Sequence, residues 1–333
     1  MCNVNNSSSC NSELPLENLD TANMFITVLN VIFVFVIIFG NALTVTAIAS
    51  FRQLQYPSNM MIAALSLADI LMGVAYTPLK LMRAHAPVFL ERREICLTFM
   101  FTSHLCSLNA IMFLSLLSIE RFYAVQFPFH YHAHVTVKTS IICNVVASVV
   151  LPMFIIPMVC GTDLWDSSVC YAPTLYPQVY TNILTSLSFA MMFIGFLCFL
   201  RVAAVELRFR RRRVRVVHEP TSTAAPDPET EITRDNNTTV NLQSEAANEI
   251  EIKGRNSAKT KVVLIAYAVS MCLWTPHIVV YIWDSNTKQH QNPYVFRVVS
   301  LLDLSSSAIN FFLYGWKNRK FRHAYFRLLG LKK

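Results

Sequence analysis

The sequence predicts an all-α membrane protein: a seven-transmembrane helix bundle with a short amphipathic helix after the seventh span. Hydrophobic residues make up 54% of the 333 residues and charged residues only 14%, whereas a soluble domain carries about 25% charged residues. Seven stretches are nearly free of charge and long enough to cross a hydrocarbon core of about 30 Å as α-helices. This composition excludes a disordered chain, and we expect neither a water-soluble enzyme nor a nucleic-acid-binding protein.

The seven spans follow from where the charged residues fall. We expect them at about 23–50, 57–80, 94–125, 138–160, 174–208, 257–284 and 293–316, so that the transmembrane domain covers 23–316. Asp69 interrupts the apolar part of the second span and Asp303 that of the seventh, while the centres of the other five contain no Asp, Glu, Lys or Arg. An odd number of spans places the two chain ends on opposite sides.

The orientation follows from the basic residues, because Lys and Arg close to span ends stay in the cytoplasm. The connections on the side of the amino terminus contain 6 of the 28 basic residues and those on the other side contain 22. We therefore expect a multi-pass plasma-membrane protein with residues 1–22 outside. Asn5 and Asn6 are glycosylation acceptors on that side. The first 20 residues do not resemble a cleavable signal peptide, so we expect the first span to act as the targeting signal.

Two segments outside the spans have distinctive amino-acid compositions. Residues 216–252, in the third cytoplasmic loop, lack apolar bulk, and we expect disorder there. The basic run just before them, Arg208–Arg215, is suited to anionic lipid headgroups. After the seventh span, residues 317–333 combine apolar Phe321 and Tyr325 with Lys and Arg, which predicts an amphipathic helix on the inner leaflet and a short cytoplasmic tail.

Two of the nine cysteines are expected to form a disulfide. Cys96 and Cys170 lie at or beyond the outer ends of spans, in an oxidising compartment where a bridge persists. We expect this bridge to join the start of the third span to the loop after the fourth. Cys2, Cys10 and Cys160 leave the remaining pairing open.

Several short motifs occur in order within these spans. They are Gly40-Asn41, Leu65-Ser66-Leu67-Ala68-Asp69, Cys96, Glu120-Arg121-Phe122, Ala124-Val125, Pro128, Trp274-Thr275-Pro276, Asn310 and Tyr314. Together they resemble a rhodopsin-like (class A) G-protein-coupled receptor over about Asn23 to Leu329, without pointing to a subfamily. The chain departs from the family pattern at Phe311, where a proline is usual, and at Phe199, where a tyrosine is expected.

The resemblance implies a receptor that binds an extracellular ligand and activates a heterotrimeric G protein by outward movement of span six. The implied coupling and switch residues are Glu120, Arg121, Trp274, Pro276, Asn310 and Tyr314. The loop from Phe127 to His134 is expected to contact the G protein. Many members of the family carry an acidic residue at the foot of span six where this chain has Asn256, so we predict measurable ligand-independent activity.

Asp69 is an ionisable residue at membrane depth, which by itself suggests a functional site. Its expected partners across the bundle are Asn41, Ser306, Ser307 and Asn310, and a purely structural polar knot is the alternative. In the family this aspartate binds sodium, but Ala110 stands where a serine ligand is usual. We therefore expect no cofactor or firm metal site, and sodium at Asp69 stays open.

The outer half of the bundle is expected to bind the ligand. The candidate residues are Thr102, Ser103, Cys106, Ser107, Asn182, Trp274, His277, Tyr281 and Asp303. Ser103 replaces the aspartate of amine receptors, which disfavours a biogenic amine, and Leu304 replaces the lysine that binds retinal. Two interpretations of Asp303 stay open: it binds a cationic group of the ligand, or it forms a hydrogen bond to a neighbouring helix.

Two other classes of membrane protein compete with the receptor. A secondary transporter using Asp69 and Asp303 is the main alternative, although such folds usually show inverted repeats, and none is visible here. An intramembrane aspartyl protease needs a glycine beside its second aspartate, whereas Leu302 and Leu304 flank Asp303. We therefore predict no enzyme, with an extracellular ligand, a G protein and membrane lipids as partners and no nucleic acid. Ligand identity, G-protein subtype and dimerisation stay open.

Overall fold

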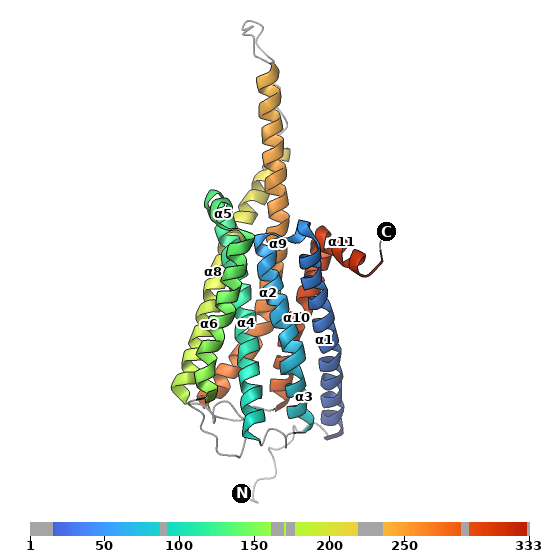
Figure 1. Ribbon diagram of the computed structural model, residues 1–333, viewed down its shortest axis with the longest axis vertical. Helices are drawn as coiled ribbons and strands as arrows, with labels where there is room; N and C mark the ends of the chain where they lie inside the picture. Colours follow the sequence, from blue (N-terminus) through green and yellow to red (C-terminus); the bar gives the residue numbers. More distant parts are fainter. Residues whose placement is uncertain are drawn as a thin grey trace, which may run out of the picture.

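The computed structural model describes residues 16–86, 92–160, 170, 177–218, 236–287 and 293–331. Within these ranges the secondary structure is helical, and the long helices run side by side as one bundle (Figure 1). The elements in order are α1 (Leu16–Ser50), η1 (Arg52–Leu54), α2 (Pro57–Leu71), η2 (Met72–Tyr76), α3 (Thr77–His85), α4 (Arg93–Gln126), α5 (Pro128–His134), α6 (Val137–Cys160), α8 (Gln178–His218), α9 (Asn236–Thr287), α10 (Pro293–Lys317) and α11 (Arg319–Leu328).

Seven helical segments among the described residues are long and apolar enough to cross a membrane. They are Thr21–Ser50, Pro57–His85, Arg93–Gln126, Val137–Ile156, Gln178–Arg208, Thr260–Trp283 and Val295–Lys317. The predicted fold class, a seven-transmembrane helix bundle with a short helix after the seventh span, is confirmed. The helix after the seventh span, α11, covers Arg319–Leu328 of the segment 317–333.

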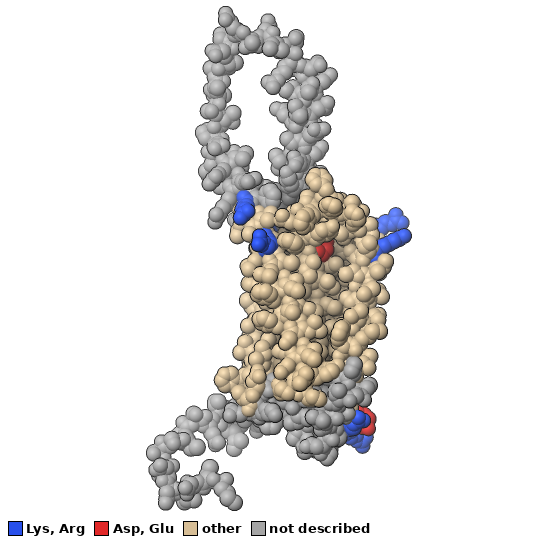
Figure 2. All heavy atoms as spheres, turned by 90° about the vertical axis from the view of Figure 1, so that its left-hand side faces the viewer, with Lys and Arg blue, Asp and Glu red and all other residues tan. Residues whose placement is uncertain are grey.

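The outer surface of the bundle is suited to lipid. Large apolar side chains such as Phe35, Met153 and Phe189 are more than half exposed along the helices, which would be costly in water. On the face in Figure 2, the Lys, Arg, Asp and Glu side chains lie towards the two ends and leave an uncharged belt between them. The chain is therefore a multi-pass membrane protein.

The second span is irregular because it contains Pro78. A proline has no N–H and disrupts the helical hydrogen bonds of the preceding turn, and the chain here passes through a wider π-helical turn, η2, between α2 and α3. The carbonyl of Met72 accepts from both the backbone N–H and the hydroxyl of Thr77, the latter at 2.9 Å, which stabilises the wider turn. The span then continues as α3, where Lys80 donates to Oδ1 of Asn30 on α1 at 3.0 Å.

Helix α4 forms the centre of the bundle and packs against α2, α6, α8 and α9. One apolar cluster fills the space around it, with Leu65, Phe99, Trp274 and Leu304 among its buried members. A second cluster lies near the end of the bundle where α11 packs, and Phe321 of α11 is completely buried in it. These clusters position the polar side chains described below.

The short helix α11 is attached to the bundle by a cap, apolar packing and one hydrogen bond. Oδ1 of Asn318 accepts from the backbone N–H of Lys320 at 3.0 Å and caps the helix start. Phe321 and Tyr325 point to the bundle and are buried, and the Tyr325 hydroxyl hydrogen-bonds with Thr44 of α1 at 2.8 Å. One face of α11 is thus fixed against α1 and α10.

The structure differs from the expected disorder of residues 216–252. Helix α8 continues to His218 and α9 begins at Asn236, and α9 projects beyond the other helices in Figure 1. The stretch Gln243–Glu251 is rich in Ala and Glu, which are strong helix formers, and it prolongs the sixth span. Residues 219–235 lie outside the described ranges.

Candidate functional site

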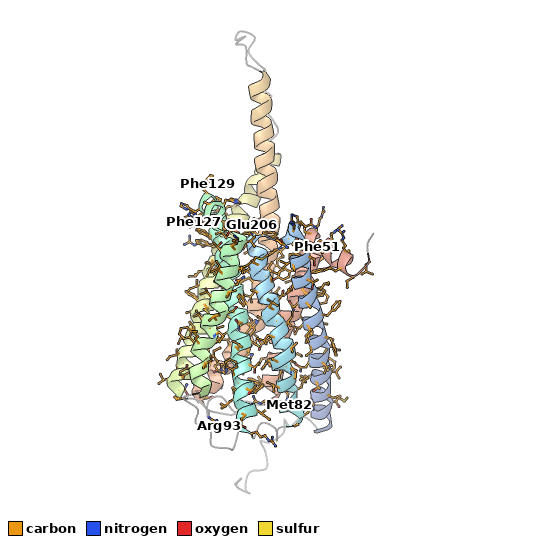
Figure 3. All side chains as sticks on the ribbon, viewed as in Figure 1. Phe51, Met82, Arg93, Phe127, Phe129 and Glu206 are labelled. Atoms are coloured by element: carbon orange, nitrogen blue, oxygen red, sulfur yellow. A yellow bond between two sulfur atoms is a disulfide. The ribbon has the colours of Figure 1, made fainter. Side chains whose placement is uncertain are left out.

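The candidate residues fall into three groups along the bundle. We call the end where α1 begins the amino end and the end where α11 lies the carboxyl end. In Figure 3, Met82 and Arg93 mark the amino end, and Phe129 and Glu206 mark the carboxyl end. One group surrounds Arg121 near the carboxyl end, one surrounds Asp69 in the interior, and one surrounds Asp303 towards the amino end.

The predicted disulfide is present. Cys96 at the start of α4 is bonded to Cys170, with a Cα–Cα distance of 5.7 Å, and both residues are buried. Cys106, Cys143, Cys198 and Cys272 are free thiols. Cys2, Cys10 and the side chain of Cys160 lie outside the described parts of the chain, as do Asn5 and Asn6.

Arg121 is held by a carboxylate on its own helix. Its Nε donates to Oε2 of Glu120 and its second terminal nitrogen donates to Oε1, both at 2.6 Å. Ser58 of α2 donates to the same Oε1 at 2.9 Å. Tyr131 of α5 also donates to it. Glu120 therefore connects α4, α2 and α5 while it binds the guanidinium.

Ser58 and Tyr131 were not among the residues that the sequence singled out. Helix α5 begins with Pro128 at its first position, which favours helix initiation, and this helix brings Tyr131 back towards α4. Burial, with a contribution from the charge of Glu120, raises the pKa of Tyr131 to about 12. The phenol therefore stays protonated at neutral pH and remains a hydrogen-bond donor to Glu120.

A second ion pair lies at the carboxyl end and joins the fifth and sixth spans. Nζ of Lys261 on α9 is 3.3 Å from Oε1 of Glu206 on α8, and the lysine side chain is about half exposed. The side chain of Asn256, one turn or more before Lys261, lies outside the described ranges. Among the described side chains, the acid that pairs with Arg121 is Glu120.

The second group is a buried polar network between α1, α2 and α10. The Ser307 hydroxyl donates to Oδ1 of Asp69 at 2.6 Å, and Nδ2 of Asn310 lies 3.3 Å from Oδ2. Nδ2 of Asn41 donates to the backbone carbonyl of Ser307 at 3.3 Å. Ser306 is not bonded to Asp69, because its hydroxyl donates to Ser270 of α9 at 3.1 Å.

The oxygen atoms around Asp69 decide whether this network can bind a sodium ion. Both carboxylate oxygens of Asp69 accept hydrogen bonds, and Ala110 contributes no side-chain oxygen. The donor set therefore lacks one ligand of the site that the resemblance implies.

Three of the switch residues, Trp274 of α9 and Asn310 and Tyr314 of α10, are buried in the interior, and Pro276 is partly buried. Trp274 is 4% exposed, and Pro276 lies inside α9 two residues later. Asn310 and Tyr314 are four residues apart on α10 and lie on the same helical face. The Tyr314 ring packs on Phe321 of α11 with centroids 5.8 Å apart, and its buried hydroxyl has no hydrogen-bond partner among the described residues.

The third group combines an aspartate with an aromatic stack. His277 of α9 donates from Nδ1 to Oδ2 of Asp303 on α10, and Asp303 is 4% exposed. The His277 ring stacks on Trp274 with centroids 6.3 Å apart and meets Phe296 edge-on at 5.6 Å. The other oxygen of Asp303, Oδ1, is buried and has no hydrogen-bond partner in the part of the chain that the structure describes.

Basic side chains of α3 lie close to this group and were not predicted as part of it. The guanidinium of Arg83 lies 5.4 Å from the centroid of Phe99 and 5.8 Å from that of Phe296. The ammonium of Lys80 lies close enough to the carboxylate of Asp303 for the two charges to attract each other. In the sequence both residues counted as part of a connection, because the helical continuation to His85 beyond Pro78 gave no distinct signal.

The remaining ligand-site candidates are distributed over several helices. The Thr102 hydroxyl donates to the carbonyl of Thr98 within α4, and Cys106 is buried. Ser103, Ser107 and Tyr281 are partly buried. Asn182 differs from the expectation, because it is exposed on α8 and accepts a hydrogen bond from Gln178 at 3.1 Å. The inward face of α8 there carries Thr181 and Leu184 instead, and Asn182 follows Thr181 by about 100° around the helix.

Comparison with known proteins gives a consistent set of relatives. Residues 40–314 match the family described as 7 transmembrane receptor (rhodopsin family). Trace amine-associated receptor 365 of Petromyzon marinus is 26% identical over 88% of this chain and 76% of its own length. Growth hormone secretagogue receptor type 1 of Homo sapiens is 25% identical over 88% of this chain and 77% of its own length. Trace amine-associated receptor 6 of Homo sapiens is 34% identical, but this match covers 39% of this chain and 37% of that receptor.

Proposed function

Because the chain belongs to the rhodopsin family of seven-transmembrane receptors, we propose that it binds an extracellular ligand and activates a heterotrimeric G protein by outward movement of α9. The family consists of receptors and not of enzymes, and it does not favour the secondary transporter. The single observation that carries the proposal is the closed pair of Glu120 and Arg121 at the carboxyl end.

The proposed orientation places the amino end of the bundle outside the cell and the carboxyl end in the cytoplasm, at the plasma membrane. It is supported by the 22 basic residues on the carboxyl-end side against 6 on the other. The disulfide between Cys96 and Cys170 lies at the amino end, which then faces an oxidising compartment. In this orientation Arg121 faces the compartment that contains G proteins.

The Glu120–Arg121 pair keeps the arginine turned towards its own helix. Both residues are less than 10% exposed, and a two-point guanidinium–carboxylate contact restricts the orientation of the side chain. When α9 moves away from α4, water and a G-protein segment gain access to Arg121, and the guanidinium exchanges Glu120 for acceptors on the G protein. The receptor thereby couples opening of the bundle to G-protein binding.

The proposed G-protein contact includes α5. Phe129 is 89% exposed and Phe127 46% exposed, and both lie at the carboxyl end in Figure 3. Exposed aromatic side chains beside a polar site are typical anchors of protein interfaces. Tyr131 on the same helix donates to Glu120, so a G protein that displaces α5 also acts on the Arg121 pair.

The proposed link from ligand to G protein passes through α9. A ligand that contacts the His277 ring also acts on Trp274, on which it stacks. Pro276 lies between these two residues and weakens the helix there. A change in the position of the His277 or Trp274 ring is therefore transmitted to the bend at Pro276, which positions the part of α9 at the carboxyl end of the bundle.

The test is nucleotide exchange on a panel of purified G proteins by the receptor in lipid nanodiscs. We expect wild-type receptor to catalyse measurable exchange without ligand, because no acid of the described part of α9 holds Arg121. Arg121→Ala should abolish this exchange and leave surface expression intact, whereas Arg52→Ala, which removes an exposed arginine at the same end, should leave exchange unchanged. Absence of exchange with every G-protein subtype, or undiminished exchange by Arg121→Ala, would contradict the proposal. Tracer uptake into vesicles would support the transporter instead.

A further inference from the structure

Asp303 is a buried carboxylate whose hydrogen bonding is incomplete. It is 4% exposed, its Oδ2 accepts from His277, and its Oδ1 has no partner within the described part of the protein. A carboxylate oxygen that has lost its water without gaining a donor is strongly destabilising. The position therefore calls for a hydrogen-bond donor that the described side chains do not provide.

The neighbouring basic residue does not fill this role. Lys80 of α3 is coupled to Asp303 electrostatically, but its ammonium donates to Asn30 of α1 at 3.0 Å. Among the described side chains, the one that hydrogen-bonds to the Asp303 carboxylate is His277. Lys80 thus offsets part of the negative charge and leaves the hydrogen-bonding position at Oδ1 open.

The rings near Asp303 can pack against an organic cation, although one of them, Phe296, already lies 5.8 Å from the guanidinium of Arg83. The partner of Asp303, His277, lies between the rings of Trp274 and Phe296, at 6.3 and 5.6 Å. Aromatic faces attract ammonium groups and also pack against apolar substituents. A group that donates to Oδ1 therefore lies beside the stack that reaches Trp274 and the bend at Pro276.

The third span provides no competing acid at this depth. The described acidic residues of α4 are Glu94 in its first turn and Glu120 near its carboxyl end. Ser103 takes the place at which the resemblance puts the aspartate of amine receptors. The buried carboxylate of this region is contributed by α10 instead.

We propose that the ligand of this receptor carries a protonated amine that donates to Oδ1 of Asp303, next to an apolar or aromatic group that packs against the rings around His277. The inference rests on the proposed function, because it names the ligand class of that receptor. The residue that binds the positive charge of the ligand is then on the seventh span, and not on the third span where amine receptors carry it. The inference also explains how binding at α10 acts on α9, since Asp303 and Trp274 share His277 as a neighbour.

The experiment compares three probes of similar shape on the purified receptor in nanodiscs: phenethylamine, 2-phenylethanol and phenylacetate. The measured quantity is the thermal unfolding midpoint as each probe is titrated into the millimolar range. We expect phenethylamine to raise the midpoint of the wild-type protein, and the uncharged and anionic probes to act only at higher concentration or not at all. In Asp303→Asn, which keeps the side-chain shape, the affinity for phenethylamine should fall about 10- to 100-fold, as expected for loss of one charged hydrogen bond.

Two controls separate a direct role from a folding defect. Thr98→Ala should bind phenethylamine like the wild type, because the Thr98 side chain is exposed on α4 and the anchor is on α10. Asp303→Asn without probe should retain a cooperative unfolding transition, which shows that the variant is folded.

The outcomes distinguish this inference from the proposed function. Stronger stabilisation by phenylacetate, unchanged phenethylamine affinity in Asp303→Asn, or no stabilisation of the wild type by the amine would overturn the amine assignment even if G-protein exchange is observed. Amine binding that depends on Asp303 in a receptor without exchange activity would support the site and reject the G-protein function.

Discussion

Individual buried polar side chains connect the helices of this protein. Asp69 joins α2 to α10 through Ser307, and Glu120 joins α4 to α2 and α5. In a membrane the apolar faces of helices gain little by leaving lipid, so hydrogen bonds and close packing contribute much of the specificity of association. Each polar residue therefore determines which helices meet as well as what chemistry is present.

Removal of the Tyr131 hydroxyl tests the role of α5 at this scale. Tyr131→Phe deletes one donor to Glu120 and leaves the ring contact with Tyr123, at 6.2 Å, available. We expect ligand-independent nucleotide exchange to rise by about 2- to 10-fold, since a hydrogen bond of about 1 kcal/mol no longer holds the closed state. A G-protein titration with matched receptor amounts measures the change, and a fall in exchange would contradict this role.

The pH dependence of the same contact has a defined sign. The pKa of Tyr131 is raised from 10.0 to about 12, so its contribution to the folded, closed state is fully present below pH 10 and is lost as the pH rises through about 12. Between pH 6 and 9 the wild type and Tyr131→Phe should therefore differ by a constant factor. A difference that varies across this range would assign the effect to another group.

The sequence located many of these residues but not their pairing. The structure brings together Asn41, Asp69, Ser307 and Asn310, because intramembrane polar residues must seek partners inside the bundle. The links of Glu120 to Ser58 and Tyr131 could not be foreseen. They depend on the rotation of α2 and on the return of α5, which composition and spacing do not determine.

At the scale of the elements, close packing of α1 on α10 depends on a glycine. A Cβ built on Gly40 would lie 2.5 Å from the ring of Phe311, which stands where the family usually has a proline. The absence of a side chain at Gly40 thus makes room for an aromatic ring on α10. The same ring lies 5.5 Å from Tyr325, so this contact extends to α11.

A double-mutant cycle tests this contact. Gly40→Ala should lower the free energy of unfolding by about 1–3 kcal/mol because it overpacks the interface, with a fall of about 2–4 °C in the unfolding midpoint per kcal/mol for a protein of this size. Phe311→Ala removes the ring, so the double variant should be more stable than the sum of the single effects indicates. Additive losses would show that the two residues do not meet.

The expected spans agree with the helices except where local chemistry interrupts the pattern. A charge-free stretch predicts a span because only length and polarity matter. The π-helical turn Met72–Tyr76 before Pro78 and the continuation to His85 were not foreseen, since Lys80 and Arg83 read as loop residues. That continuation brings their charges close to Asp303 and Phe296, so the irregular element shapes the amino-end group.

For the whole molecule, the distribution of basic residues predicts the topology. We expect an epitope tag at the amino terminus to bind antibody on intact cells and a tag at the carboxyl terminus to do so only after permeabilisation. Endoglycosidase treatment should increase gel mobility, and replacing both Asn5 and Asn6 by Gln should remove that shift. Accessibility of both tags from one side of intact cells would reject an odd number of crossings and the proposed function with it.

The length of α9 has a mechanical consequence. Helix α9 begins at Asn236, 40 residues before Pro276, which corresponds to about 60 Å at 1.5 Å per residue. If the part of α9 from Asn236 to Pro276 rotates as a rigid rod about Pro276, a rotation of about 10° displaces its first turn by about 10 Å. A shift of α9 by less than a bond length beside His277 therefore corresponds to a displacement of about one helix diameter at the start of α9, at the opposite end of the bundle.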